Sequence, residues 1–504
     1  MRIRASMLVW AAVSGLVLAL TATSAAQAAP EKKTYKIIPY VISDPALVKD
    51  PQRVIAEFTK HQNLDALGVA PATSDGPSKL AGSAATLADP VSFVVDSSRF
   101  NGGKKPADPY NYISEDECDD NYDAASDDAG WIKNRFSYCQ IHLVYMPAVS
   151  CGLFPPRCEV VGNFLSSNTL IGHGKIGAAE GHSTTRWAQF TLDVDILTRT
   201  GPWLGGGASL EAEFECDGNY LDEDFPQTDA NACFPGPTDD NDKSLNQWMI
   251  DDDATLDLYS QASSPSASAG EQVGTGVFHI EYDFDLPWFI EFLDTESPEG
   301  GMRFDTAWYL NVANADKLGS VFDRAVPGLS VNETDPAVEG AARHIEDART
   351  NPAATVPTKA NKVLHGATPS DPLHRLAGAK SPALRTRATR NRTVSTNFCA
   401  TVAMPPRPET GGPFDCDEYA MASTYEGSAR SEYEGSQYDL DYSVRWVNRS
   451  QNQEAGRRIG RWYEVDRILD SEQFFITTTD TGPVPEPDPN PEDPDPDDPG
   501  PIEP

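Results

Sequence analysis

Residues 277–284 read Val-Phe-His-Ile-Glu-Tyr-Asp-Phe, and the apolar positions 278, 280, 282 and 284 alternate with polar ones. Successive side chains of a strand point to opposite faces, so this period of two predicts a strand with one buried face and one solvated face. Similar runs rich in β-branched and aromatic residues, bounded by Gly, Pro, Asn and Asp, occur at 140–145, 187–194, 208–214 and 307–312. We therefore predict an all-β, sandwich-like domain over residues 131–315.

The cysteines indicate that this domain is stapled by disulfides. Eight are present, and six lie in or just before the β region, namely Cys118, Cys139, Cys151, Cys158, Cys216 and Cys233. None of the spacings is the C-x2-C pair of zinc or redox sites, so a structural role is favoured. Cys151 with Cys158, or Cys216 with Cys233, could each close a loop, but the sequence leaves the connectivity open.

The two ends of the chain have distinctive compositions. Arg2 and Arg4 precede an apolar stretch and the small-residue pattern Ala26-Gln27-Ala28, which predicts a secretory signal peptide over residues 1–28. No later segment approaches the roughly 20 apolar residues of a membrane helix, so we expect an exported protein without a membrane span. Residues 480–504 are acidic and rich in proline, which predicts a disordered, extended tail.

The charge balance is strongly acidic, with 76 Asp and Glu against 40 Lys and Arg and a net charge of −36. This balance disfavours a protein that holds nucleic acid through a global positive field, so an anionic substrate must be received locally. The acidic region 29–130 is not assigned to a fold. Its acidic cluster at 115–128 lacks the ligand order of a known calcium loop and is interpreted as a solvated loop. The aspartate-rich stretches 239–242 and 251–253 are interpreted as a solvated acidic face, with a structural calcium site as the alternative.

A basic segment interrupts this acidic chain. Between residues 340 and 396 lie ten Lys and Arg residues, among them Arg385 and Arg392, and only Glu346, Asp347 and Asp371 oppose them. We interpret residues 316–396 as a basic linker. It either keeps the chain soluble or draws DNA phosphates toward the following domain, and both roles are compatible.

Acidic residues gather again in the last domain, where 415–427 read Asp-Cys-Asp-Glu-Tyr-Ala-Met-Ala-Ser-Thr-Tyr-Glu-Gly. A strand-like run follows at 442–447, and Ile459, Trp462 and Tyr463 recur at helical spacing within 457–465. Residues 473–477 are typical of a closing strand. These patterns predict a small mixed α/β domain over residues 397–479.

Three sequence motifs in this domain, taken in their order and spacing, form a distinctive pattern. D-E-Y-x-M-A-x-x-x-E-G begins at Asp417, N-x-x-A-G begins at Asn452, and R-I-L-D-x-x-x-F begins at Arg467. Together they resemble the NucA/NucB deoxyribonucleases. The resemblance implies metal-dependent, endonucleolytic cleavage of DNA outside the cell, with Mg²⁺ or Mn²⁺ as cofactor and DNA as the partner.

Candidate catalytic residues follow from the resemblance and from the chemistry of phosphodiester hydrolysis. Carboxylates that hold a divalent cation can activate water and neutralise charge on the phosphoryl oxygens. Asp417 and Glu418 are adjacent and should diverge on a regular element, so Asp417 is the first choice of metal ligand and Glu418 a supporting residue. Glu426 is the second candidate for ligand or base, and Asn452 could orient water or a phosphate oxygen through its amide.

Further residues complete the predicted site. Arg445 and Arg457 are candidate phosphate clamps. A disulfide between Cys399 and Cys416 would close a loop of about 17 residues, contribute on the order of 3 kcal/mol and support Asp417 next to it.

Some features leave alternatives open. Gln451 stands where the family resemblance implies an acidic residue, and the general base could be His374, His365 or neither. One rival interpretation is therefore an extracellular binding protein with a degenerate nuclease domain, its β domain taking an unknown ligand. The other is a nuclease toxin aimed at competing cells, which requires a protective inhibitor.

Overall fold

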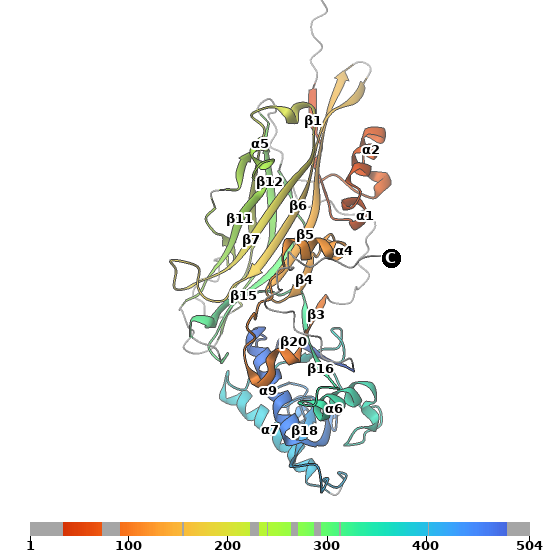
Figure 1. Cartoon of the computed structure of the whole chain (residues 1–504), viewed down its shortest axis with the longest axis vertical. Helices are drawn as coiled ribbons and strands as arrows, with labels where there is room; N and C mark the ends of the chain where they lie inside the picture. The colour runs from red at the N-terminus through yellow and green to blue at the C-terminus, as the bar shows by residue number, and fades with distance from the viewer. Residues whose placement is uncertain are drawn as a thin grey trace, which may run out of the picture.

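The computed structural model describes residues 34–72, 91–153, 156–221, 231–238, 240–263, 271–286, 294–311, 314–401 and 403–480. The predicted signal peptide and, apart from Asp480, the predicted acidic tail lie outside these ranges. Figure 1 shows a large β-sandwich unit along the upper part of the long axis and a smaller α/β unit, called the C-terminal unit below, beneath it. Within the described ranges, no helix has the length and apolar character needed to cross a bilayer.

The first sheet of the sandwich is antiparallel and has eight strands, in the order β1-β5-β6-β7-β11-β9 with β2 and β4 also paired to β5. Its strands are β1 (Thr34–Ile37), β2 (Tyr40–Ile42), β4 (Trp131–Asn134), β5 (Ser137–Leu153), β6 (Pro156–Gly174), β7 (Thr185–Arg199), β9 (Phe234–Pro235) and β11 (Asp253–Gln261). Part of the unassigned region 29–130 therefore completes this sheet.

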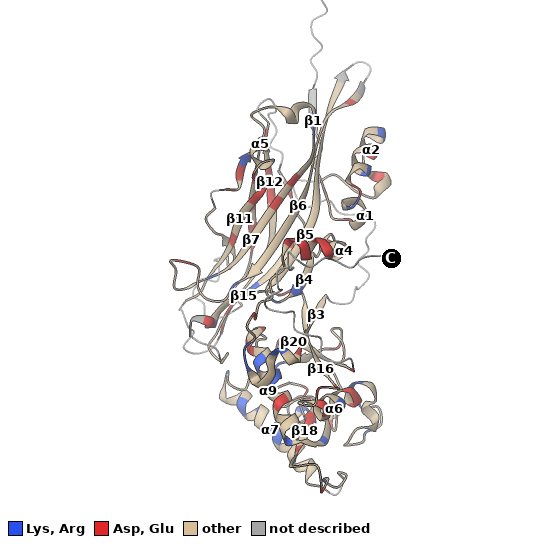
Figure 2. Cartoon of the chain, viewed as in Figure 1, with Lys and Arg blue, Asp and Glu red and all other residues tan. Residues whose placement is uncertain are grey.

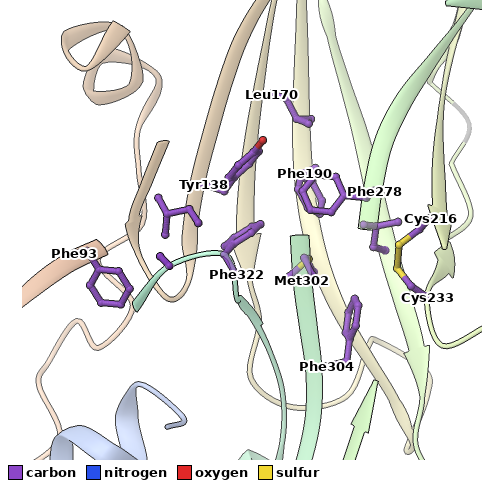
Figure 3. Close-up of a cluster of buried hydrophobic side chains, with 14 of the residues drawn as sticks. Phe93, Tyr138, Leu170, Phe190, Cys216, Cys233, Phe278, Met302, Phe304 and Phe322 are labelled. Atoms are coloured by element: carbon purple, nitrogen blue, oxygen red, sulfur yellow. A yellow bond between two sulfur atoms is a disulfide. The ribbon is translucent and has the colours of Figure 1, made fainter. Parts of the chain in front are cut away.

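The second sheet packs face to face on the first. Its order is β10-β8-β12-β14-β15, and β13 also pairs with β12. The strands are β8 (Ser209–Asp217), β10 (Asp242–Ser244), β12 (Glu271–Asp285), β13 (Asp294–Glu296), β14 (Gly300–Ala307) and β15 (Leu318–Phe322). The core between the sheets is rich in aromatic rings, and Figure 3 shows Phe190 of β7 beside Phe278 of β12. The centre of the Phe190 ring lies 4.7 Å from that of Phe214 and 5.1 Å from that of Phe278. The alternation in 277–284 thus buries one face of β12, as predicted.

Short helices cover the outer face of the first sheet. They are α1 (Pro45–Val48), α2 (Pro51–His61), η1 (Asp65–Leu67), α3 (Glu115–Asp120) and α4 (Tyr122–Ala125), while η3 (Gly201–Leu204) and α5 (Leu245–Trp248) lie at connections between strands. Val54 and Phe58 of α2 pack against Leu143 and Tyr145 of β5. Because β5 is buried on both faces, its sequence is less alternating than that of an exposed strand.

Four disulfides join the eight cysteines as Cys118–Cys139, Cys151–Cys158, Cys216–Cys233 and Cys399–Cys416. The first three lie in the sandwich unit and the last in the C-terminal unit. The prediction of a multidomain chain, with a disulfide-stapled all-β part and a small α/β part, is confirmed.

One predicted strand is wrong in position. The run 307–312 was expected to be a strand, but β14 ends at Ala307, residues 308–309 form a turn, and residue 312 lies outside the described residues. Tyr309 and Leu310 instead pack against Ala377 and Leu469 of the C-terminal unit. Their apolar character therefore serves the junction between the units and not a sheet.

The C-terminal unit contains a four-stranded sheet of order β17-β20-β16-β3 and a separate pair, β18 and β19. The strands are β3 (Ser92–Asp96), β16 (Val326–Asn332), β17 (Leu373–His374), β18 (Phe414–Tyr419), β19 (Ser443–Asn448) and β20 (Gln473–Thr479). The helices are η2 (Ser97–Gly103), α6 (Glu339–Thr350), η5 (Pro352–Ala354), α7 (Pro382–Cys399), α8 (Arg430–Glu434), η6 (Ser436–Tyr438) and α9 (Arg449–Val465), whereas η4 (Asn314–Lys317) connects β14 and β15 of the sandwich unit. Strand β3, far away in sequence, thus forms one edge of this sheet.

The interpretation of residues 316–396 as a linker is corrected by the structure. This segment contains β15, β16, α6, β17 and α7, and Ala341, Ile345 and Ala348 of α6 are buried in the core. The basic composition of this segment suggested a solvated linker, but many of its basic side chains are paired with carboxylates of the same unit. Arg387 binds Glu434 and Arg390 binds Glu432.

A buried ionic network connects the two units. Asp305 of β14, which is 0% exposed, accepts hydrogen bonds from Arg467, which is 1% exposed. Arg303 of β14 lies 3.2 Å from Asp305 and 2.6 Å from Glu472. Burial alone would raise the pKa of Asp305, but the neighbouring Arg467 and Arg303 hold this pKa below its ordinary value. The units are therefore joined by paired charges inside the protein and not by a flexible linker.

Candidate active site

The candidate site is built on β18, β19 and α9. Strands β18 and β19 are antiparallel, with Asp417 opposite Arg445, and α9 begins directly after β19. The side chain of Asn448 accepts a hydrogen bond from the Ser450 backbone N–H at 3.0 Å and caps this helix. The helix begins eight residues earlier than the predicted 457, so Asn452 lies on its first turns.

A cleft of about 730 Å³ opens between these elements and the helices α6 and α7. Asp417, Glu418 and Asn452 all line it, so three of the predicted catalytic residues share one hollow. Arg392, Arg407 and Arg449 line the same cleft. The ribbons of α7 and α9 carry Lys and Arg positions, blue in Figure 2, and the acidic chain thus offers local positive charge beside its carboxylates.

Asp417 is held by a buried histidine that the sequence analysis did not select. His344 of α6 is 1% exposed, and its Nδ1 lies 2.7 Å from Oδ2 of Asp417. Its Nε2 lies 2.7 Å from the Ser443 hydroxyl. With a proton on Nδ1 the ring donates to Oδ2 of Asp417, so the other oxygen of Asp417 remains for a ligand.

Glu418 points to the opposite helix. Its carboxylate accepts a hydrogen bond from the hydroxyl of Ser395 on α7. Burial raises the pKa of Glu418 to about 7, the hydrogen bond from Ser395 opposes this rise, and the charge of Asp417 adds to it. The two adjacent carboxylates therefore diverge as expected for a strand, and they have different environments.

The neighbouring residue Gln451 does not line the cleft. Its Oε1 accepts from the Gly340 backbone N–H at 3.2 Å, and its Nε2 donates to the Pro336 carbonyl oxygen at 3.0 Å. The amide side chain therefore ties the start of α9 to the start of α6. Gln451, which stands where the family resemblance implies an acidic residue, therefore lies at a contact between the two helices and not in the cleft.

Glu426 is placed outside the cleft. It is 6% exposed and accepts hydrogen bonds from the backbone N–H of His374 at 2.9 Å and from His374 Nδ1 at 2.8 Å. This hydrogen bond raises the pKa of His374 above its ordinary value. The second histidine considered, His365, is paired with Asp371 at 2.6 Å. Neither histidine lines the cleft.

The two predicted arginine clamps are also engaged elsewhere. Arg445 binds Asp347 of α6, and Arg457 binds Glu454 at 2.8 Å. Neither lines the cleft.

Two cleft arginines, Arg392 on α7 and Arg407, are exposed and make no ion pair with a carboxylate of the described residues. Arg449 is paired with Asp415 at 2.8 Å. A signal for Arg392 existed, since it belongs to the basic segment, but its position beside Glu418 depends on the packing of α7.

The donor set of the cleft suits a hard cation. Asp417 offers a carboxylate oxygen and Asn452 an amide oxygen, and Mg²⁺ typically takes one or two carboxylates together with water and substrate phosphate. Among the described residues, a tighter acidic group of three carboxylates occurs in the sandwich unit, at Asp193, Asp252 and Asp253. Asp252 and Asp253 are exposed, which agrees with the interpretation of this stretch as an acidic surface.

Comparison with known proteins identifies the C-terminal part of the chain. No curated protein matches the sequence. Residues 367–477 match the family model described as Deoxyribonuclease NucA/NucB, and the match includes β18, β19, α9 and most of the cleft. It excludes the sandwich unit, β16 and the helix that carries His344. This chain therefore contains, in its C-terminal unit, a domain of the NucA/NucB deoxyribonuclease family.

Proposed function

We propose that the protein is an exported, divalent-metal-dependent deoxyribonuclease that hydrolyses internal phosphodiester bonds of DNA. The observation that carries the proposal is the cleft itself, where Asp417, Glu418 and Asn452 lie together with two exposed arginines inside the family domain. Oxygen donors for a cation beside a cationic side chain for a phosphate are what this hydrolysis requires.

Asp417 and Asn452 are the residues we assign to Mg²⁺ or Mn²⁺. Such a cation, when bound, lowers the pKa of water and neutralises charge on the phosphoryl group. His344 fixes the Asp417 carboxylate from behind, so that its other oxygen keeps one orientation. Glu418, hydrogen-bonded to Ser395, is the supporting carboxylate on the other wall.

Arg392 is the proposed phosphate ligand, because its guanidinium is exposed at the cleft and offers several N–H donors. Glu426, with no place in the cleft, is proposed to position His374 and the turn that follows β18. Arg445 is proposed to brace α6 through Asp347, and Arg457 to brace α9 through Glu454.

Export is part of the proposal. Four disulfides suit an oxidising compartment, and the N-terminal residues have the pattern of a signal peptide.

Two alternative functions predict different experimental results. A non-catalytic binding protein would show no metal-dependent cleavage, and a toxin would kill cells that produce the C-terminal unit in the cytoplasm without a protective partner.

The test is cleavage of supercoiled plasmid by the full mature chain in Mg²⁺, in Mn²⁺ and in EDTA. We expect nicked and then linear DNA with metal and none with EDTA. Asp417→Asn keeps the shape of the side chain but removes its charge, and it should abolish cleavage. Asp439→Asn is the matched control, since Asp439 is exposed and outside the cleft. Intact plasmid under all conditions, with folded and oxidised protein, would rule out the proposed function.

A further inference from the structure

A second hollow of about 300 Å³ adjoins the cleft. Its walls are mainly apolar and include Val356, Met404, Pro405, Pro406 and Trp446. Trp446 lines both hollows, so the indole stands at the boundary between them. We call the second hollow the apolar groove.

The polar side chains of the apolar groove are already engaged. Arg445 is its charged lining residue and binds Asp347. Ser443 is hydrogen-bonded to His344 at 2.7 Å. The groove therefore offers little to a phosphate, whereas the neighbouring cleft presents arginines. A neutral ligand with a large apolar face is the better complement.

The indole of Trp446 is held in place. Its Nε1 donates to the Pro405 carbonyl oxygen at 3.2 Å, and its backbone in β19 lies opposite Cys416, which is disulfide-bonded to Cys399. The ring also packs against the small apolar cluster that contains Met404. It is nevertheless partly exposed, so a rigid aromatic surface remains at the edge of the cleft.

The guanidinium of Arg407 lies close to the Trp446 ring. The Arg407 side chain lies 5.8 Å from the centre of the Trp446 ring and lines the cleft. An aromatic side chain that binds a base, next to an arginine that reaches the backbone, is the combination by which proteins bind single strands.

We propose that the apolar groove receives an unpaired nucleobase next to the cleaved phosphate, stacked on Trp446. This inference rests on the proposed function, and it names the preferred substrate as single-stranded or locally unpaired DNA. A base within a duplex is covered on both faces by its neighbours, so it reaches the groove only after leaving the stack. Trp446 thereby determines the form of DNA that binds best.

The test measures binding of fluorescent oligonucleotides to the full mature chain in EDTA, which separates binding from cleavage. The probes are a 15-nucleotide single strand, the same sequence as a blunt duplex, and single strands with one abasic site at successive positions. We expect the wild-type chain to bind the single strand more tightly than the duplex. Trp446→Leu, which keeps an apolar side chain, should weaken single-strand binding roughly tenfold and reduce the preference.

Two controls keep the result interpretable. Trp446→Phe retains an aromatic face and should recover most of the single-strand affinity, whereas Phe234→Leu removes a partly exposed aromatic ring of the sandwich unit and should change nothing. An abasic site at one position should weaken binding to the wild-type chain and add little to the loss in Trp446→Leu. Because the abasic arm uses the unaltered protein, it remains valid if a variant misfolds.

The outcomes separate the two proposals. If the wild-type chain prefers the duplex, or if neither Trp446→Leu nor any abasic site changes the affinity, the groove does not hold a base, even if plasmid is cleaved. If Trp446 controls single-strand binding but the chain cleaves no DNA with Mg²⁺ or Mn²⁺, the groove assignment stands and the nuclease activity is refuted.

Discussion

Replacement of His344 by leucine tests the proposed site. The role of this residue is inferred only from its contact with Asp417, because it lies outside the matched family domain. The imidazole is 1% exposed and makes two hydrogen bonds of 2.7 Å, to Asp417 and to Ser443. His344→Leu removes both and leaves the Asp417 carboxylate free to rotate. Loss of a partner that orients a metal ligand typically costs 10- to 100-fold in metal affinity or activity, or about 1.4–2.7 kcal/mol.

The assay is the initial rate of plasmid nicking as a function of Mn²⁺ concentration. For His344→Leu we expect half-saturation to move to a higher metal concentration and the maximal rate to fall. His344→Asn retains a donor near the position of Nδ1 and should recover part of the loss, which a merely space-filling role would not predict. Thermal unfolding of each variant verifies that the fold is kept. Wild-type metal dependence and rate in a folded His344→Leu protein would refute the reasoning.

Three further predictions concern the rest of the molecule. Asp305→Asn leaves the buried guanidinium of Arg467 without its counter-charge, and urea denaturation should show a loss of about 3–5 kcal/mol. Arg385→Gln with Arg392→Gln removes two cations of α7, and the slope of log Kd for DNA against log salt should fall by about two, while unchanged salt dependence would show that they do not contact phosphates. Burial lowers the pKa of His142 from 6.5 to about 3. Because the pKa is lower in the folded state, protonation of His142 favours unfolding, and the free energy of unfolding should fall by about 2 kcal/mol between pH 7 and pH 5. His142→Gln, which cannot be protonated, should lack this decrease when denaturation is measured at both pH values.

The local patterns of the sequence predicted much of the secondary structure. The alternation in 277–284 identified β12, and the helical spacing of Ile459, Trp462 and Tyr463 identified α9, because the faces of an element are written directly in its periodicity. The strand prediction for 307–312 was wrong although it used the same apolar signal, because that signal reports burial and not the type of element. Its apolar residues are buried, but against another unit and in a turn.

The order of motifs identified the family of the last domain, and the adjacent pair Asp417 and Glu418 was found from sequence. Periodicity could not show what these carboxylates contact. His344 lies 73 residues before Asp417, in a segment whose composition is typical of a linker, and only the packing of α6 against β18 brings them together. Ser395 reaches Glu418 from α7 in the same way.

The sequence by itself therefore determined the types of element, the presence of the family motifs and the carboxylates that are candidates for a cation site. Tertiary structure alone decided which of them share the cleft. Glu426 and Arg457 are engaged with His374 and Glu454, while Arg392 lines the cleft and the buried His344 contacts Asp417. The physical reason is that periodicity and motif spacing record interactions between near neighbours in the chain. Ion pairs and hydrogen bonds at the site join distant segments, whose approach is set by the burial of the apolar faces of α6, α7 and α9.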